Sequence, residues 1–223
     1  MTHCKYCGCS GWFFALNPAG LCGNCAHIVG MEITQRKQHM RDALDRADHT
    51  VNPHTRLARI EEMLKDLEAL SKYEEKGIPT IEGSPKDEHQ RRREQLDALL
   101  LETAQQETDS ALARVVSAED AAAKTKVYSD LLLRLADYRE KAEKKDALHA
   151  LERKIRDAVL QIELDGRLLR ARNEEARGSN AEALALYQEA LTYLKALDMD
   201  VELRIKHVAR INGKVKELKA KLS

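Results

Sequence analysis

The sequence predicts a mainly α-helical protein, a long helical hairpin or coiled-coil bundle with a small metal-binding module at its N-terminus. Three observations support this fold class. All five cysteines of the 223-residue chain lie at or before position 25. Aromatic residues make up only 4% of the chain, which favours a core of Leu, Ile, Val and Ala between helices over a sheet core. After position 30 the apolar residues recur at helical spacing over long stretches.

The N-terminal segment 1–30 contains two C-x2-C pairs, Cys4 with Cys7 and Cys22 with Cys25, separated by positions 8–21. Two turns that each present two thiolates can surround one tetrahedral zinc ion. Because four thiolates close the coordination shell, we expect one structural Zn²⁺ and no position for a catalytic water. Cysteines confined to metal-ligand spacing, with no secretion signal before them, indicate a reducing compartment, and we expect a cytoplasmic protein.

Three residues near the cysteine pairs are further candidates. Cys9 is a spare thiol that could replace a neighbouring ligand, although we expect it to stay outside the site. His3 and His27 flank the pairs, and we expect both to be bystanders. A reactive Cys9 beside one of these histidines is the one enzymatic route that the sequence offers, since a low-pKa thiol needs a positive setting such as Lys5. The sequence contains no other catalytic motif, and we expect a protein that is not an enzyme.

The residues between the two pairs predict a hairpin. Trp12, Phe13 and Phe14 have strand propensity, and Asn17–Gly20 form a predicted turn. Alternate side chains of a strand point to opposite faces, so one aromatic face must pack on the helical body or on a partner. The order of metal turn, hairpin and metal turn opening a helix resembles the treble-clef or zinc-ribbon class of zinc modules. This resemblance implies a metal site, not an activity.

Two proline-based start signals divide the next part of the chain. Ala26 to about Thr50 is a predicted helix, whose apolar stripe comprises Ile28, Ile33, Met40, Leu44 and Ala47. Asn52-Pro53 supplies a cap and a first-turn proline for a second helix, which ends before Gly77. Ser84-Pro85 begins the third. The second helix has an apolar stripe of Leu57, Ile60, Met63, Leu64, Leu67 and Leu70.

The long stretch between Pro85 and Gly166 contains neither Gly nor Pro. A single helix over this whole stretch would extend about 120 Å, so we expect a break. Ser117–Asp120 matches a capping box and predicts two or more long helices folded back as a hairpin. Further along, the apolar residues keep a near-heptad spacing suited to antiparallel coiled-coil packing. They are Leu148, Leu151, Ile155, Val159, Ile162 and Leu169.

The C-terminal part of the chain predicts three helices, Leu164–Arg177, Ala181–Leu197 and Val201–Leu222, joined by short turns. The run Arg177–Leu191 resembles two helical families, the tetratricopeptide repeat and the microtubule-interacting and transport domain. The third helix favours the latter, a three-helix bundle. Both families bind short peptide segments in helical grooves, so the resemblance implies a peptide-binding function. The predicted domains are a zinc-binding module at 1–30, an elongated helical region at 31–163, and a three-helix bundle at 164–223.

Charge narrows the function classes. The 37 basic and 37 acidic residues cancel, so the whole molecule has no field that draws it to nucleic acid or to an anionic membrane. No apolar run is long enough to span a membrane. We expect a non-enzymatic adaptor or scaffold that binds other proteins or self-associates through its helices. The alternative is nucleic-acid binding through the zinc module and four basic residues of the helix after it, Arg36, Lys37, Arg41 and Arg46.

A second basic group, Arg91-Arg92-Arg93, also suggests a phosphate contact. It is flanked by Glu88, Glu94 and Asp97 on a predicted helix. Alternating charges of this kind are typical of a solvated helix face, which we favour over a nucleic-acid contact.

Overall fold

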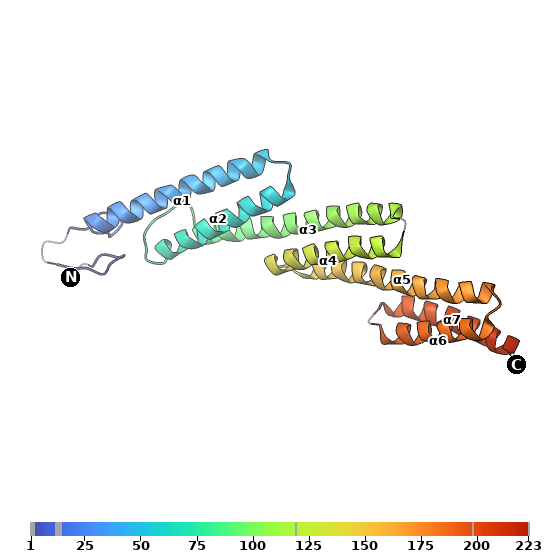
Figure 1. Ribbon diagram of the computed structural model, residues 1–223. Helices are drawn as coiled ribbons and strands as arrows, with labels where there is room; N and C mark the ends of the chain where they lie inside the picture. Colours follow the sequence, from blue (N-terminus) through green and yellow to red (C-terminus); the bar gives the residue numbers. More distant parts are fainter. Residues whose placement is uncertain (1–2, 12–14, 119, 198, 223) are drawn as a thin grey trace. The chain divides into compact units, whose positions relative to one another are not determined.

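The computed structural model describes residues 3–11, 15–118, 120–197 and 199–222. These residues contain seven α-helices and no β-strand, which confirms the mainly α fold class (Figure 1). None of the helices described is both long and apolar enough to cross a membrane. The helices are α1 (Gly23–His49), α2 (Pro53–Glu74), α3 (Pro85–Ser117), α4 (Ala121–Lys141), α5 (Asp146–Ala176), α6 (Asn180–Ala196) and α7 (Val201–Leu222).

The chain divides into two compact units. The first unit consists of Met1–Thr103 and Ala142–Lys144, and the second of Ala104–Lys141 and Lys145–Ser223. Helix α3 therefore contributes its first part to one unit and its last part to the other. The three domains predicted from the sequence stay a prediction.

Helices α1 and α2 form an antiparallel pair in the first unit (Figure 1). The predicted cap of α2 is confirmed, because the Asn52 side chain accepts hydrogen bonds from the backbone N–H groups of His54 (2.9 Å) and Thr55 (3.3 Å). Pro53 occupies the first turn. The predicted apolar stripe of α2 is confirmed too, since all six of its members are buried: Leu57, Ile60, Met63, Leu64, Leu67 and Leu70.

Helix α1 starts at Gly23, inside the second cysteine pair and before the predicted start at Ala26. Its predicted stripe is correct only in part. Val29 is fully buried, whereas Ile28 is 57% exposed. Val29 lies four residues after the buried Cys25 and so shares its helix face. The prediction from apolar spacing had placed the buried position one residue earlier, at Ile28. Of the other stripe members, Ala47 is buried and the rest are half-buried: Ile33, Met40 and Leu44.

The predicted break in the long helical stretch is confirmed. Helix α3 ends at Ser117 and α4 begins at Ala121. The cap comes from Asp120, whose carboxylate accepts from the backbone N–H of Ala123 at 2.6 Å, and not from Ser117, as the capping-box pattern suggested. The Ser117 hydroxyl donates back to the carbonyl of Arg114. Within the second unit, Arg134 of α4 pairs with Glu107 of α3 at 3.5 Å, as the hairpin predicts.

A second break, between Lys141 and Asp146, has no local sequence signal. The carboxylate of Asp97 in α3 accepts hydrogen bonds from the backbone N–H groups of Glu143 and Lys144, each at 3.0 Å. Asp97 is buried, and so is Ala142 at the break. A side chain from a distant part of the sequence thus satisfies two backbone donors of the turn between α4 and α5.

Helices α5, α6 and α7 pack in sequence in the second unit. Helix α5 runs unbroken from Asp146 through Gly166, so the predicted start of a helix at Leu164 is wrong. On α6, the small residues Ala183 and Ala190 and the large residues Tyr187 and Leu194 are all buried. One buried core cluster joins these three helices. It comprises Leu164, Leu168, Ala171, Ala183, Tyr187, Ala190, Leu194, Met199, Ile211, Val215 and Leu218.

The heptad stripe on α5 predicted Leu169 as a core residue, and this is wrong. Leu169 is 55% exposed, whereas Leu168 is 2% exposed. The buried residues Leu164, Leu168 and Ala171 follow a spacing of four and three that matches the face turned toward α6.

Leu168→Ala should lower the free energy of unfolding of the full chain by about 2 to 5 kcal/mol, because it leaves a cavity in a close-packed core. Leu169→Ala should change it by under about 1 kcal/mol, since the side chain is largely in water already. Urea unfolding followed by circular dichroism measures both. Equal effects of the two substitutions would contradict the core assignment.

Candidate metal centre

The first cysteine pair lies in a tight turn. The N–H of Gly8 donates to the carbonyl of Cys4 at 2.8 Å, and the N–H of Cys4 donates to the carbonyl of Cys9 at 2.9 Å. Gly8 has φ of 72°, in the left-handed region that side chains disfavour. This backbone path places the side chains of Cys4 and Cys7 on the same side of the turn.

The second pair straddles the start of α1. Cys22 is the N-cap residue of this helix and Cys25 lies in its first turn, as the treble-clef resemblance implies. The predicted turn before Cys22 is confirmed, since the N–H of Gly20 donates to the carbonyl of Asn17 at 2.8 Å. The N–H of Lys5 donates to the carbonyl of Gly20 at 3.0 Å, which joins the two cysteine turns directly.

The four predicted ligands come together. The Sγ atoms of Cys4, Cys7, Cys22 and Cys25 all lie within 4.8 Å of one another. Cys7 Sγ and Cys22 Sγ are 3.9 Å apart. A tetrahedral site with metal–sulfur bonds of about 2.3 Å separates its sulfur atoms by about 3.8 Å. The Cys7–Cys22 distance matches that spacing and no pair exceeds 4.8 Å, so the four cysteines could hold a metal ion.

Hydrogen bonding and burial act in opposite directions on two of these thiols. The backbone N–H of Cys7, helped by those of Cys22 and Tyr6, lowers the pKa of Cys4 to about 6. The N–H of Cys22 lies 3.4 Å from Cys4 Sγ. Burial, with the neighbouring sulfur of Cys22, raises the pKa of Cys25. A bound cation reverses the second effect, because it favours the thiolate that coordinates it.

The other candidates lie outside the group of four. Cys9, His3 and His27 are exposed, and within the described residues none joins a cluster able to hold a metal. An isolated antiparallel bridge pairs His3 with Ser10. The predicted aromatic strand, Trp12–Phe14, lies outside the described residues.

The cysteine turns pack on a small core that sequence reasoning missed. Leu21 and Val29 belong to one buried cluster with Tyr73, at the end of α2, and Ile78, in the segment after it. Tyr6, next to the first pair, stacks on Tyr73 with ring centroids 6.0 Å apart. The Nζ atom of Lys5 donates to the carbonyl of Gly77 at 2.7 Å. Since these partners lie far apart in the chain, no local pattern could have revealed them.

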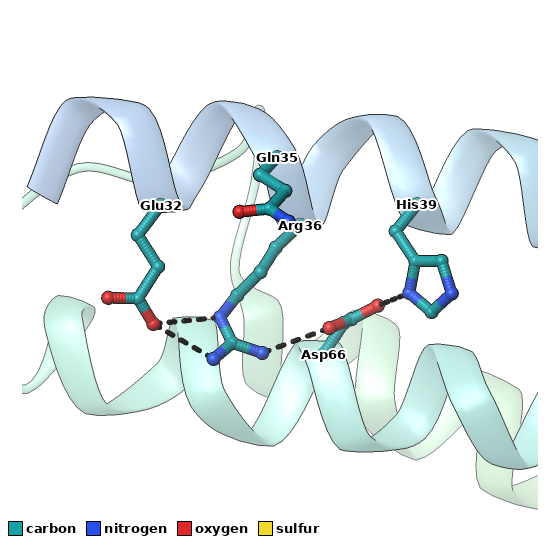
Figure 2. A pocket seen from close by; sticks show the side chains of 5 residues that line it. All are labelled: Glu32, Gln35, Arg36, His39 and Asp66. Carbon is teal, nitrogen blue, oxygen red and sulfur yellow. Dashed lines mark hydrogen bonds and ion pairs between the residues drawn. The ribbon is translucent and has the colours of Figure 1, made fainter.

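A chain of polar contacts continues from Tyr73 along α1 and α2. The Tyr73 hydroxyl donates to Glu32, which also accepts from Arg36 at 2.8 Å. Figure 2 shows Arg36 of α1 between Glu32 and Asp66, the latter on α2. The second oxygen of Asp66 lies 2.5 Å from His39 Nδ1. These side chains line a cavity of about 290 Å³, and Arg36 and Asp66 tie α1 to α2.

Arg36 of the first predicted basic group and all three arginines of the second pair with carboxylates. Arg36 pairs with two of them, as above. Arg91 and Arg92 pair with Glu88 at 3.3 and 2.8 Å, and Arg93 pairs with Glu143 at 3.0 Å. The three arginines are ion-paired as expected, but only Arg91 is exposed to solvent, whereas Arg92 and Arg93 are half-buried.

Comparison of the chain with protein-family models, with curated proteins and with solved structures finds no match. The resemblances to treble-clef modules and to helical peptide-binding domains therefore depend on the residues given above. The function is argued below from the geometry of the sites.

Cys22→Ser should abolish the binding of one metal ion per chain, because it removes a quarter of the ligand set. Cys9→Ser should retain full metal content. Elemental analysis of the purified proteins measures this, and circular dichroism should show most of the helical signal in both variants, since helices α3 to α7 contain no ligand. Equal metal loss in the two variants would contradict the ligand assignment.

Glu32→Gln should make the first unit less sensitive to acid. Tyr73 and then Arg36 hold the pKa of Glu32 below its usual value. A carboxyl with a depressed folded pKa stabilises the fold above its unfolded pKa of about 4.3, and this stabilisation is lost as pH falls through the folded pKa.

The free energy of unfolding of the Glu32→Gln variant should thus lie below that of the parent chain at pH 7, and the difference should shrink below about pH 4. Glu68→Gln, which removes a surface pair with Lys72, serves as the control and should change the free energy of unfolding at pH 7 by under about 1 kcal/mol. Urea unfolding at a series of pH values measures both. A difference for Glu32→Gln that stays constant with pH would contradict this assignment.

Proposed function

We propose that this chain is a non-enzymatic adaptor or scaffold with one structural Zn²⁺ in its N-terminal module. Four thiols at tetrahedral spacing are a ligand set that zinc favours, and they leave no open position for a reacting water. The module is of the treble-clef kind, with its second cysteine pair at a helix start. A reducing compartment such as the cytoplasm keeps these thiols available to the metal.

The observation that carries the adaptor function is an exposed apolar groove on the second unit. It has a volume of about 490 Å³ and is lined by Lys195 of α6 and by residues of α7, among them Ile205 and Val208. Ile205 is 63% exposed, and Val201, one turn earlier, is 57% exposed. Residues four apart share a helix face, so Val201, which does not line the groove, extends the apolar strip of Ile205 beyond it.

The charge of α7 identifies the kind of partner. Both charged residues of the groove, Lys195 and Arg204, are cationic. Helix α7 has seven basic residues against Glu202 and Glu217. An amphipathic helical segment with acidic residues beside its apolar face is complementary to this surface. The basic residues are Arg204, Lys206, Arg210, Lys214, Lys216, Lys219 and Lys221.

Nucleic-acid binding is the second candidate, through the zinc module and the basic residues of α1. Two of the four, Arg41 and Arg46, are exposed and able to reach phosphates. Arg36 is held between Glu32 and Asp66, which removes one cation from the set. A fall in affinity with rising salt would distinguish this function from peptide binding in the apolar groove.

Ile205→Asp should abolish the recovery of a partner by the full-length chain in affinity purification. The substitution places a carboxylate in the apolar strip, and because Ile205 is already exposed, the fold should be retained. Leu169→Asp, also at an exposed leucine but on α5, is the matched control and should recover the same partner. If no protein depends on Ile205 for recovery, the proposal fails.

A further inference from the structure

The first unit has a further cavity, separate from the one at Asp66. It is lined by residues of α1, α2, α3 and the segment between α2 and α3. Its volume is about 230 Å³. Four apolar side chains form its inner wall: Met40, Leu44, Met63 and Ile81. Met63 is 2% exposed and the other three are half-buried. The cavity is therefore apolar inside, and two of its four apolar side chains are methionines, which adapt to differently shaped ligands.

The volume limits what the cavity can hold. Pockets for drug-sized ligands occupy about 300 to 1,000 Å³. An apolar cavity of about 150 Å³ admits one benzene molecule. At about 230 Å³, this cavity has room for one aliphatic side chain and a small polar group beside it.

The charged residues around the cavity include two cations that have no partner in the part of the chain that the structure describes. Arg92 is engaged, because it donates to Glu88 at 2.8 Å and to Gln95 at 2.9 Å. Lys37 and Arg41, one turn apart on α1, make no hydrogen bond or ion pair among the described residues. An anionic group on a ligand would meet two positive charges at the α1 side of the cavity.

The acids of the cavity modify this picture. The Glu88 carboxylate is neutralised by Arg92 and by Arg91, at 2.8 and 3.3 Å. Glu82, in the segment before α3, is exposed and has no cationic partner among the described residues. A ligand that fits must therefore offer a carboxylate to Lys37 and Arg41 and also a hydrogen-bond donor to Glu82.

We propose that this cavity binds the C-terminal residue of a partner polypeptide, where that residue is aliphatic. The side chain lies on Met40 and Met63, and the terminal carboxylate pairs with Lys37 and Arg41. The backbone N–H groups of the peptide supply donors for Glu82. A free short-chain fatty acid has the same apolar chain and carboxylate but no N–H group, so the unpaired glutamate favours a polypeptide.

The proposal is independent of the groove on the second unit. This cavity and the groove share no lining residue and belong to different units. Ile205→Asp should leave peptide binding at the first unit unchanged, so failure of one proposal does not decide the other.

Nuclear magnetic resonance of the full chain labelled with ¹³C at its methionine methyl groups tests the proposal. The probe is a pentapeptide, acetyl-Gly-Gly-Ser-Gly-Leu with a free C-terminal carboxylate. Met40 and Met63 should shift on titration, whereas Met31, exposed on another face of α1, and Met199, in the second unit, should not. The same peptide with an amidated C-terminus should bind at least about tenfold more weakly. Hexanoate, which lacks N–H donors, should also bind more weakly than the acid peptide.

Variants of the two cations complete the test. Arg41→Gln and Lys37→Gln should each weaken binding of the acid peptide by about tenfold and leave binding of the amide unchanged. Arg46→Gln, at an exposed cation on α1 that does not line the cavity, is the matched control and should bind normally. Equal affinity for acid and amide, tighter binding of hexanoate than of the peptide, or no shift of Met40 and Met63 would each overturn the proposal.

Discussion

A segment of about 30 residues cannot bury enough apolar surface to fold unaided, and the N-terminal module brings together four thiols that could hold a metal ion. Its core consists of a few side chains around the cysteines, and two of them, Tyr73 and Ile78, belong to the end of α2 and the segment after it. Metal coordination of such a site is worth about 10 to 16 kcal/mol at neutral pH, more than a core of this size supplies. The contacts of Lys5 and Tyr6 then join the module to α2 and the turn that follows it. The cysteine module therefore shares its core with the end of α2 and depends on that helix for its folding.

In both units, a glutamate that binds a tyrosine hydroxyl and a cation helps to join the helices. In the first unit the Tyr73 hydroxyl donates to Glu32, which also binds a cation, Arg36. In the second, the Tyr187 hydroxyl donates to Glu175 at 3.0 Å, and Lys214 of α7 binds the same carboxylate at 3.3 Å. Burial raises the pKa of Glu175, but these two partners outweigh it and the pKa is lowered. The tyrosine ring packs in the core while its hydroxyl reaches a polar partner at the edge.

The sequence predicted those features whose cause is local. The cysteine spacing located the group of four thiols, and Asn52-Pro53 and Ser84-Pro85 located two helix starts. At Asn52 the capping side chain lies next to the backbone that it caps. The break after Lys141 was missed because its cap, Asp97, comes from another helix.

The prediction of which helix face is buried was wrong at two positions for a related reason. Apolar spacing could not choose between the adjacent residues Ile28 and Val29, or between Leu168 and Leu169, since each pair offers two equally apolar side chains. Tertiary contacts made the choice: the buried Cys25 in the first case and the α6 interface in the second. The arginine–carboxylate network at Asp66 joins two helices and likewise has no signature in either one alone.

The hydrogen bonds from Glu143 and Lys144 to Asp97 have a consequence for how this chain can be divided. The residues Ala142–Lys144 belong to the first unit although helices of the second unit precede and follow them. A single cut after Thr103 would therefore leave an amino-terminal piece without Ala142–Lys144, and Asp97 would lose both of its backbone donors. The amino-terminal piece, expressed alone, would therefore lack part of its own unit, whereas the carboxyl-terminal piece would hold every residue of the second unit and three residues of the first.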